Sequence, residues 1–426
     1  MRRVALSLSA LLALLVASPV AWADPDPDGW HPFAVREEIA GRTWRARDGT
    51  GGLLLGVAGR GDAGLDGRWV REVPVTPGRE YAFHAEWHAQ RVKSTTRSVL
   101  ARVVWLDAKG TPLRPMEYPV QVPSSSAESE WTTLEGTYKA PETTVEARLE
   151  LHLRWTAGGE VTWRRVSFRE AAPRAPRRVR LAAIHHRPRG TKSPAESLQR
   201  FVALVEQAAV RGADIICLPE GITAEGNGLT YAEAAEAVPG PTTAALGALA
   251  KRLGVWIVAG LYERSGAHIH NTAVLVGRDG ALVGRYRKMS LPDEEIDGGL
   301  TPGSDAPVFR TDFGTVGLMI CWDSSYPEVA RTLGARGAEV ILMPIAGGEE
   351  TLVQARAVEN QLFIVASGYD FRSGIFDRRG QRVADAKADP DVLVAEVDLA
   401  ERVEWPWLGE WRARIGREGP AWATTP

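Results

Sequence analysis

Hydrophobic and polar residues follow two different patterns along the chain, and the change falls near residues 171–178. Before that point, segments such as GREYAFHAEWHAQ and EARLELHLRW alternate apolar and polar residues with a period of two, and turns rich in Gly, Pro and Asp separate them. This alternation is typical of strands that bury one face, and several such strands at regular spacing indicate a sandwich or barrel. We therefore expect residues 24–172 to form an all-β sandwich.

The segment AAPRAPRR at 171–178 has no apolar periodicity and is typical of a linker, which we place at 173–178. Helices and strands alternate after it. Ser193 and Glu196 are spaced as a capping box around Pro194, which predicts a helix start there, and Gly212 ends that helix before a buried strand at 214–218. Residues 179–400 therefore have the pattern of an α/β domain.

This helix-and-strand unit occurs twice. AVRGADIICLPEG at 209–221 is echoed by GARGAEVILMPIA at 334–346, and VWIVAGLY at 255–262 is echoed by LFIVASGY at 362–369. The spacing predicts a degenerate duplication of one helix-on-sheet half. Two such halves bury their strands when they pack sheet to sheet.

The first 23 residues have the features of a signal peptide. MRRVALSLSALLALLVASPVAWA begins with two arginines, continues with a leucine-rich stretch and ends in Ala21-Trp22-Ala23, which fits a cleavage site. We expect cleavage after Ala23 and export to the periplasm or the extracellular space; an uncleaved anchor helix is the alternative. The formal net charge of −2, without a long run of like charges, gives no indication of a nucleic-acid partner.

The two cysteines lie in different surroundings. Cys217 is inside the apolar run ADIICLPE, whereas Cys321 ends the run VGLMIC and precedes a turn. They could pair with each other, but these contexts favour two free thiols, one buried and one exposed. A thiol at a strand-to-helix turn can gain acidity from nearby helix amides and a cation, which makes it a candidate nucleophile.

Two charged residues also follow apolar strands. Glu220 comes directly after a buried strand and Pro219, at the edge where α/β folds place their sites, and a carboxylate held there can act as a general base. Lys288 follows VGRDGALVGRYR and precedes Pro292. Taken singly, a glutamate such as Glu220 is more typical of a helix cap or a surface position, and a lysine such as Lys288 is more typical of a solvated surface cation.

Together, Glu220, Lys288 and Cys321 occur in an order that resembles the nitrilase, or carbon–nitrogen hydrolase, superfamily. The resemblance covers about 179–400 and rests on four motifs: LPEG, YRKMSLP, GLMICWDSSYPEVAR and ARAVENQLFIVASGY. It implies a four-layer αββα sandwich, with Glu220 as general base, Cys321 as nucleophile and Lys288 as stabiliser of the tetrahedral intermediate. It also implies a second catalytic glutamate; Glu295 fits the spacing better than Glu294.

The implied activity is that of an exported amidohydrolase that cleaves a non-peptide C–N bond, in an amide or N-carbamoyl compound, through a thioester. Lys288 and the backbone amide of Trp322 would hold the oxyanion, and no metal or organic cofactor is required. A true nitrilase is one alternative, although the nitrile branch typically has glutamate where this chain has Asp323. An inactive hydrolase fold that supports a glycan-binding module is the other.

The flanking regions are rich in tryptophan. Residues 24–172 resemble jelly-roll carbohydrate-binding modules, which implies a glycan partner, but tryptophans that alternate along strands are more typical of a core. The predicted C-terminal tail, 401–426, contains VEWPWLGEWRARIGREGPAW, which indicates an interface in a homodimer or larger homo-oligomer. A tail folded back on its own domain is the alternative. The relevant tryptophans are Trp69, Trp87, Trp105, Trp131, Trp155 and Trp163 in the module and Trp405, Trp407, Trp411 and Trp422 in the tail.

Overall fold

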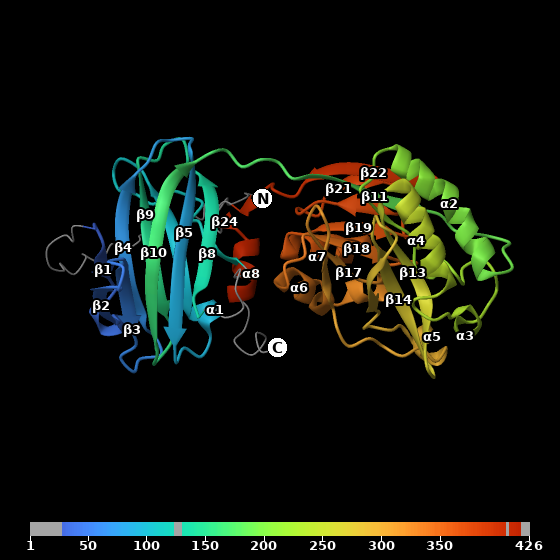
Figure 1. Cartoon of the computed structure of the whole chain (residues 1–426), viewed down its shortest axis with the longest axis horizontal. Helices are drawn as coiled ribbons and strands as arrows, with labels where there is room; N and C mark the ends of the chain where they lie inside the picture. The colour runs from blue at the N-terminus through green and yellow to red at the C-terminus, as the bar shows by residue number, and fades with distance from the viewer. Residues whose placement is uncertain (1–27, 123–129, 406–408, 419–426) are drawn as a thin grey trace, which may run out of the picture. The chain divides into compact units, whose positions relative to one another are not determined.

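The computed structural model describes residues 28–122, 130–405 and 409–418. The chain divides into two compact units (Figure 1). One combines the residues up to Pro173 with those from Trp405 onward, and the other runs from Arg174 to Glu404. The predicted signal peptide, residues 1–23, lies outside the described residues. In the part of the chain that is described, no helix is both long and apolar enough to cross a membrane.

The N-terminal unit contains two antiparallel sheets that face each other around one hydrophobic core. One sheet has the order β1 (His31–Phe33), β4 (Asp66–Pro74), β9 (Glu146–Arg154) and β6 (Val99–Leu106). The other has the order β2 (Arg42–Arg47), β3 (Leu53–Ala58), β10 (Glu160–Ala171), β5 (Glu80–Gln90), β8 (Thr132–Lys139) and β7 (Val120–Val122).

Period-two alternation determines which side chains reach this core. Along β9, Leu149, Leu151 and Leu153 are buried and face the other sheet. Among the six tryptophans of the module named above, Trp69, Trp87, Trp105 and Trp163 belong to the core, whereas Trp155 is 44% exposed. Most of these rings therefore stabilise the fold instead of forming a surface platform.

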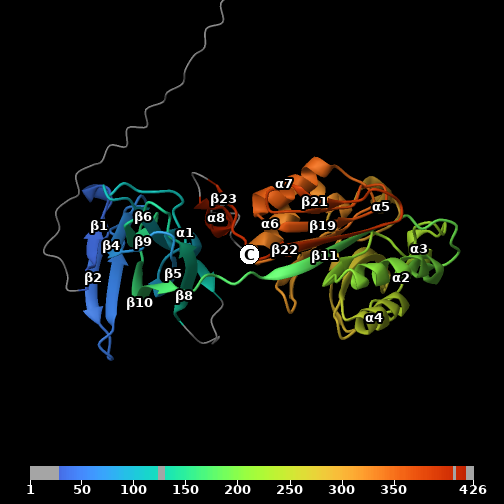
Figure 2. The same ribbon diagram turned by 90° about the horizontal axis from the view of Figure 1, so that it is seen from above.

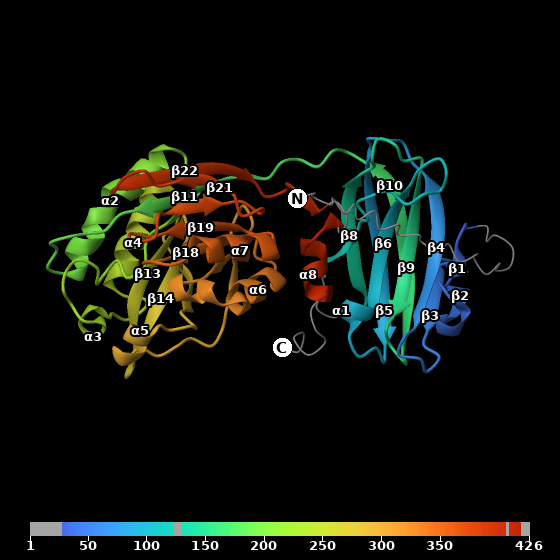
Figure 3. The ribbon, with the colours of Figure 1, turned by 180° about the vertical axis from the view of Figure 1, so that it is seen from behind.

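From Trp405 onward, the described part of the C-terminal tail belongs to the N-terminal unit. It forms β23 (Glu404–Trp405), which pairs with β24 (Gly409–Glu410), followed by α8 (Arg412–Glu418). Helix α8 contacts α1 (Thr95–Ser98), as Figure 3 shows from behind, and Arg417 lies 4.1 Å from the centroid of the Tyr118 ring. The tail thus folds back onto its own chain, but onto the N-terminal unit; Trp407 and Trp422 lie outside the described residues.

The second unit is built on two six-stranded mixed sheets. The first has the order β15 (Leu282–Arg287), β14 (His268–Val276), β13 (Trp256–Ser265), β12 (Ile215–Cys217), β11 (Arg178–His185) and β22 (Asp391–Asp398). The second has the order β16 (Val308–Arg310), β17 (Thr315–Leu318), β18 (Val340–Pro344), β19 (Phe363–Ser367), β20 (Gly374–Phe376) and β21 (Arg382–Asp385).

Helices cover the outer face of each sheet, so the unit has four layers (Figure 2). The first sheet packs against α2 (Pro194–Val210) and α4 (Pro241–Leu253), and the second against α6 (Pro327–Ala335) and α7 (Glu350–Asn360). Between the sheets, Ile215 and Cys217 share one core with Leu342 and Val365. The predicted α/β architecture is confirmed.

The start of α2 shows how the sequence specifies these elements. Pro194 is the first helical residue, as predicted, and the Ser193 hydroxyl accepts a hydrogen bond from the Glu196 N–H at 3.3 Å. The reciprocal bond differs from a capping box, because the Glu196 carboxylate accepts from the N–H of Lys192. The predicted repeat is visible in β12 and β18, each the middle strand of three parallel neighbours.

Candidate active site

Glu220 lies three residues beyond β12, in a turn where the parallel strands of the first sheet end. Its side chain is buried and accepts three hydrogen bonds: Oε1 from Asn271 Nδ2 at 2.7 Å and from Lys288 Nζ at 2.9 Å, and Oε2 from the Ala346 N–H at 2.7 Å. Gly260 on β13 allows this approach, because a Cβ there would lie 2.7 Å from the Glu220 Cα. The carboxylate is therefore fixed in position.

Lys288 directly follows β15 and is almost completely buried, with 1% of its surface exposed. Its Nζ donates to Glu220 Oε1 at 2.9 Å and to Glu295 Oε1 at 3.0 Å. Burial by itself lowers the pKa of Lys288, but the charges of Glu220 and Glu295 outweigh it, so the pKa is raised and the amine stays protonated. The alternative of a solvated surface cation is wrong.

The structure distinguishes the two adjacent glutamates of the short helix α5 (Asp293–Asp297). Glu295 is buried and contacts Lys288, whereas Glu294 is exposed. Burial raises the pKa of Glu295, the charge of Lys288 opposes that shift, and the nearby Glu220 adds to it. Glu295 and not Glu294 therefore belongs to the charged cluster, which agrees with the spacing preferred from the sequence.

Asn271 on β14 completes the cluster, and sequence reasoning missed it. Its Nδ2 donates to Oε1 of Glu220 at 2.7 Å and to Oε1 of Glu295 at 2.6 Å. Nδ2 of this amide and the ammonium of Lys288 each bridge the same two carboxylates. The alternation of HIHNTAVLV predicts that Asn271 lies on a strand, but it contains no signal that separates a buried bridging amide from an ordinary polar position.

Cys321 begins the 3-10 helix η2 (Cys321–Ser325), just after β17. Its φ of +42° lies in the left-handed region, which is uncommon and strained for a residue with a side chain. The thiol donates to the Gly347 carbonyl at 3.3 Å. Both cysteines are free, as predicted, and Cys217 is in the core, but Cys321 is only 9% exposed, so the expectation of an exposed thiol is wrong.

The acidity expected for this thiol is also absent. Burial, followed by the charge of Glu220, raises the pKa of Cys321, and Lys288 only partly opposes that shift. The resting thiol is therefore protonated at neutral pH. A reaction that uses its sulfur as a nucleophile requires a nearby base to remove the proton.

Asp323 ties the turn of Cys321 to the loop after Lys288. Its carboxylate is fully buried and accepts hydrogen bonds from the Tyr286 hydroxyl at 2.7 Å, the Ser290 N–H at 2.8 Å and the Ile320 N–H at 3.0 Å. Burial raises the pKa of this carboxyl group, while the donors oppose the shift. Asp323 thus positions two loops, a role that the motif alone did not reveal.

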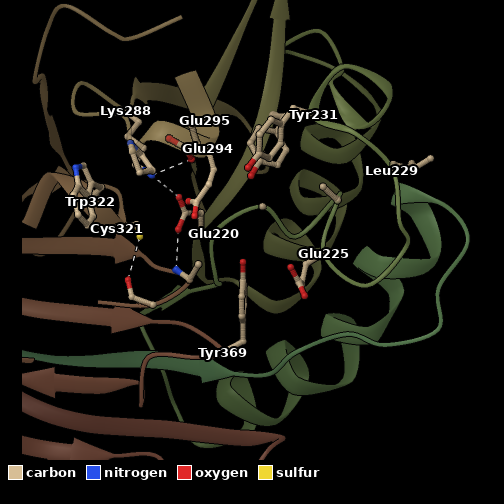
Figure 4. A pocket seen from close by; sticks show the side chains of 16 residues that line it. Glu220, Glu225, Leu229, Tyr231, Lys288, Glu294, Glu295, Cys321, Trp322 and Tyr369 are labelled. Atoms are coloured by element: carbon tan, nitrogen blue, oxygen red, sulfur yellow. Dashed lines mark hydrogen bonds and ion pairs between the residues drawn. The ribbon is translucent and has the colours of Figure 1, made fainter. Parts of the chain in front are cut away.

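A cavity of about 380 Å³ gives access to these groups (Figure 4). The candidate residues Glu220, Lys288, Glu295 and Cys321 all line it, and so does Trp322, whose side chain is 42% exposed. The cavity is also lined by Gly221, Ala224, Glu225, Leu229, Tyr231, Tyr262, Pro292, Glu294, Ala346, Gly347 and Tyr369. A thiol, two carboxylates and an ammonium thus meet in one small space, a combination suited to acyl transfer.

Comparisons with known proteins agree with this chemistry. Residues 180–406 match the family described as Carbon-nitrogen hydrolase. Omega-amidase NIT2 of Mus musculus is 30% identical over 254 residues, which cover 53% of this chain and 90% of that protein. Deaminated glutathione amidase of Synechocystis is 32% identical over 234 residues, which cover 48% of this chain and 86% of that protein.

Two solved structures also match the chain. The carbon-nitrogen hydrolase from Helicobacter pylori G27 is 27% identical, with a TM-score of 0.45, and the match covers 52% of this chain and 90% of that one. An amidase from Nesterenkonia sp. is 24% identical, with a TM-score of 0.47, and the match covers 54% and 94%. Because the family match spans more than half of the sequence, this chain belongs to the carbon–nitrogen hydrolases, enzymes that act on carbon–nitrogen bonds other than peptide bonds.

Proposed function

We propose that this enzyme hydrolyses a primary amide or N-carbamoyl compound through a thioester on Cys321. The observation that carries the proposal is that Lys288 Nζ contacts both Glu220 and Glu295 in the cavity that also contains the Cys321 thiol. The amidases among the similar proteins support an amide substrate.

In the first half of the reaction, the Cys321 sulfur attacks the amide carbonyl carbon while Glu220 takes the thiol proton. The raised pKa of Cys321 makes this proton transfer necessary, because little thiolate exists beforehand. Lys288 and the backbone N–H of Trp322 stabilise the oxyanion. Collapse of the intermediate breaks the C–N bond, and Glu220 returns the proton to the departing ammonia.

In the second half, a water molecule attacks the thioester carbonyl and gives its proton to Glu220. The second tetrahedral intermediate uses the same oxyanion donors. Its collapse breaks the C–S bond, returns the proton to the sulfur and releases the acid. Glu295 and Asn271 take part by holding the catalytic groups in place. Glu295 contacts Lys288, and Asn271 contacts Glu220 and Glu295.

A nitrile substrate is less favoured. In this chain the carboxylate two residues after the nucleophile, Asp323, is fully buried and accepts several hydrogen bonds, so the longer glutamate of the nitrile branch would have to fit into a filled site. A panel of primary amides, N-carbamoyl compounds and nitriles, with released ammonia as the readout, tests the proposal. Ammonia from some amide or N-carbamoyl compound is expected, and ammonia from nitriles alone would contradict it.

We also propose export and glycan binding. Export rests on the sequence of residues 1–23, and N-terminal sequencing of the protein from a periplasmic or culture fraction tests it. For the N-terminal unit, the partly exposed rings of Trp44 and Trp155 support contact with a sugar, because an apolar sugar face can stack on an aromatic ring. Loss of binding to immobilised polysaccharides in Trp155→Ala would support that partner, and binding to none of them by the wild type would contradict it.

We propose a homodimer or larger homo-oligomer as the assembly. Light scattering of the whole chain tests it, and a monomer would contradict it. Residues 409–418 contact the N-terminal unit of their own chain, so this described part of the tail gives no support for an interface between chains.

A further inference from the structure

The cavity carries an excess of negative charge. Glu225 and Glu294 line it in addition to Glu220 and Glu295, and among the described residues that line it Lys288 supplies the only positive charge. Arg187, outside this lining, pairs with Glu225 at 2.8 Å. Even with Arg187 counted, four carboxylates face two cations, so a negatively charged group is repelled from the cavity.

Lys288 is not free to bind a carboxylate of the substrate. Its Nζ already contacts Glu220 and Glu295, and in the proposed reaction it faces the carbonyl oxygen. Oε2 of the buried Glu295 has no hydrogen-bond partner among the described residues, so the negative charge of this carboxylate is only partly matched by Lys288. The cavity therefore lacks a spare cation for a substrate carboxylate.

Aromatic rings form much of the rest of the wall. Trp322 lies on the side of Cys321, and Tyr231 and Tyr369 lie across the cavity from it (Figure 4). Tyr231 also packs on Tyr262, with ring centroids 4.7 Å apart. Rings that border a negatively charged space attract cations through their faces, and a carboxylate such as Glu294 adds to that attraction.

We propose that the amide substrate carries a cationic group, such as a protonated amine, at the end remote from the scissile bond, and that Glu294 and the aromatic wall recognise it. This inference rests on the proposed amidase function. It names Glu294 as a specificity-determining residue, although the sequence offered this glutamate only as an alternative to Glu295. A carboxylate at the same end of the substrate is disfavoured.

Three five-carbon primary amides that differ in terminal charge test the preference directly: δ-aminovaleramide, valeramide and glutaric acid monoamide. We expect kcat/KM to fall in that order, with about ten-fold or more between the cationic and anionic compounds. Glu294→Gln should shrink this ratio several-fold. Asp297→Asn is the matched control, because it removes one exposed charge from the same helix but lies outside the cavity, and it should leave the ratio unchanged.

A second measurement does not depend on amide turnover. In a Cys217→Ser background, Cys321 is the only thiol, and its labelling by cationic aminoethyl methanethiosulfonate is compared with labelling by the anionic sulfonatoethyl reagent. Each rate is divided by that for a free thiol. We expect the cationic reagent to be favoured by about ten-fold. This preference should be smaller in Glu294→Gln and unchanged in Asp297→Asn.

The possible outcomes separate the two claims. Equal or better hydrolysis of glutaric acid monoamide, with no labelling preference, would overturn the charge preference and leave the amidase intact. Ammonia release from none of these amides and from no compound of the wider amide and N-carbamoyl panel, together with preferred labelling by the cationic reagent, would contradict the amidase but support the charge preference of the cavity.

Discussion

Lys288 and Glu220 form an ion pair in which Nζ lies 2.9 Å from Oε1 and both side chains are almost completely buried. The same ammonium also contacts Glu295 at 3.0 Å. Burying such charges costs much hydration energy, which the ion pairs to Lys288 offset. The pair therefore contributes to both stability and the proposed chemistry. Lys288 is the proposed donor to the oxyanion, and Glu220 is the proposed base that takes the thiol proton.

Lys288→Met should lower both stability and turnover. Two carboxylates would remain buried without their cation, and breaking a buried pair in this way costs about 3–5 kcal/mol. Chemical denaturation at neutral pH measures the change in the free energy of unfolding. Lys251→Met, an exposed lysine on α4, serves as the control and should change stability by less than about 0.5 kcal/mol. Similar stability of the two variants would contradict the buried cluster.

Glu220→Gln should make the Cys321 thiol more acidic but reduce amide turnover. The charge of Glu220 helps to raise the pKa of Cys321, and Lys288 opposes it, so the neutral amide should lower the pKa of the thiol. Alkylation by iodoacetamide then rises at lower pH than in the wild type, because a lower pKa increases the thiolate fraction below it. Amide hydrolysis falls, since the proposed base is lost. A parallel loss of alkylation and hydrolysis would contradict this account.

Asn271→Ala should reduce kcat about ten-fold or more, because Glu220 and Glu295 each lose a buried hydrogen-bond donor, at a cost of about 1–3 kcal/mol. Asn271→Asp should be worse, since it places a third carboxylate beside the first two. Steady-state kinetics and thermal unfolding of both variants test whether Asn271→Asp is less active and less stable than Asn271→Ala. An aspartate variant as active as the alanine variant would show that Asn271 does not position charged carboxylates.

The sequence indicated much of this molecule, and the failures have physical causes. Pro194 predicted the start of α2, and the apolar runs predicted the strands and helices of the layers. These predictions succeeded because such signals are local in the sequence. The resemblance named Glu220, Lys288, Glu295 and Cys321, and the structure brings all four into one cavity. The burial of Cys321 was missed, because a turn in the sequence does not reveal what packs around it.

Long-range contacts were the least predictable. The tail reaches the N-terminal unit through residues such as Arg417 and Tyr118, which are far apart in the chain, and no local pattern encodes their contact. Asn271 was missed for the same reason, since one partner, Glu220, lies in the turn after β12 and the other, Glu295, lies on α5.

Removal of residues 405–426 should destabilise the N-terminal unit and leave amide turnover unchanged. The deleted segment includes α8, which packs on α1, whereas every proposed catalytic residue lies within 174–404. Differential scanning calorimetry, run alongside an ammonia assay, should show a lower unfolding temperature for one transition only. Loss of turnover with unchanged thermal transitions would contradict the assignment of the tail to the N-terminal unit.

The central claim is that Cys321 becomes acylated during turnover. Rapid-quench mass spectrometry of the whole protein during amide hydrolysis, followed by peptide mapping, measures this most directly. The account predicts an acyl adduct on the peptide that contains Cys321, none on the peptide of Cys217, and loss of both adduct and turnover in Cys321→Ser. Undiminished ammonia release by Cys321→Ser, or an adduct at another residue, would contradict it.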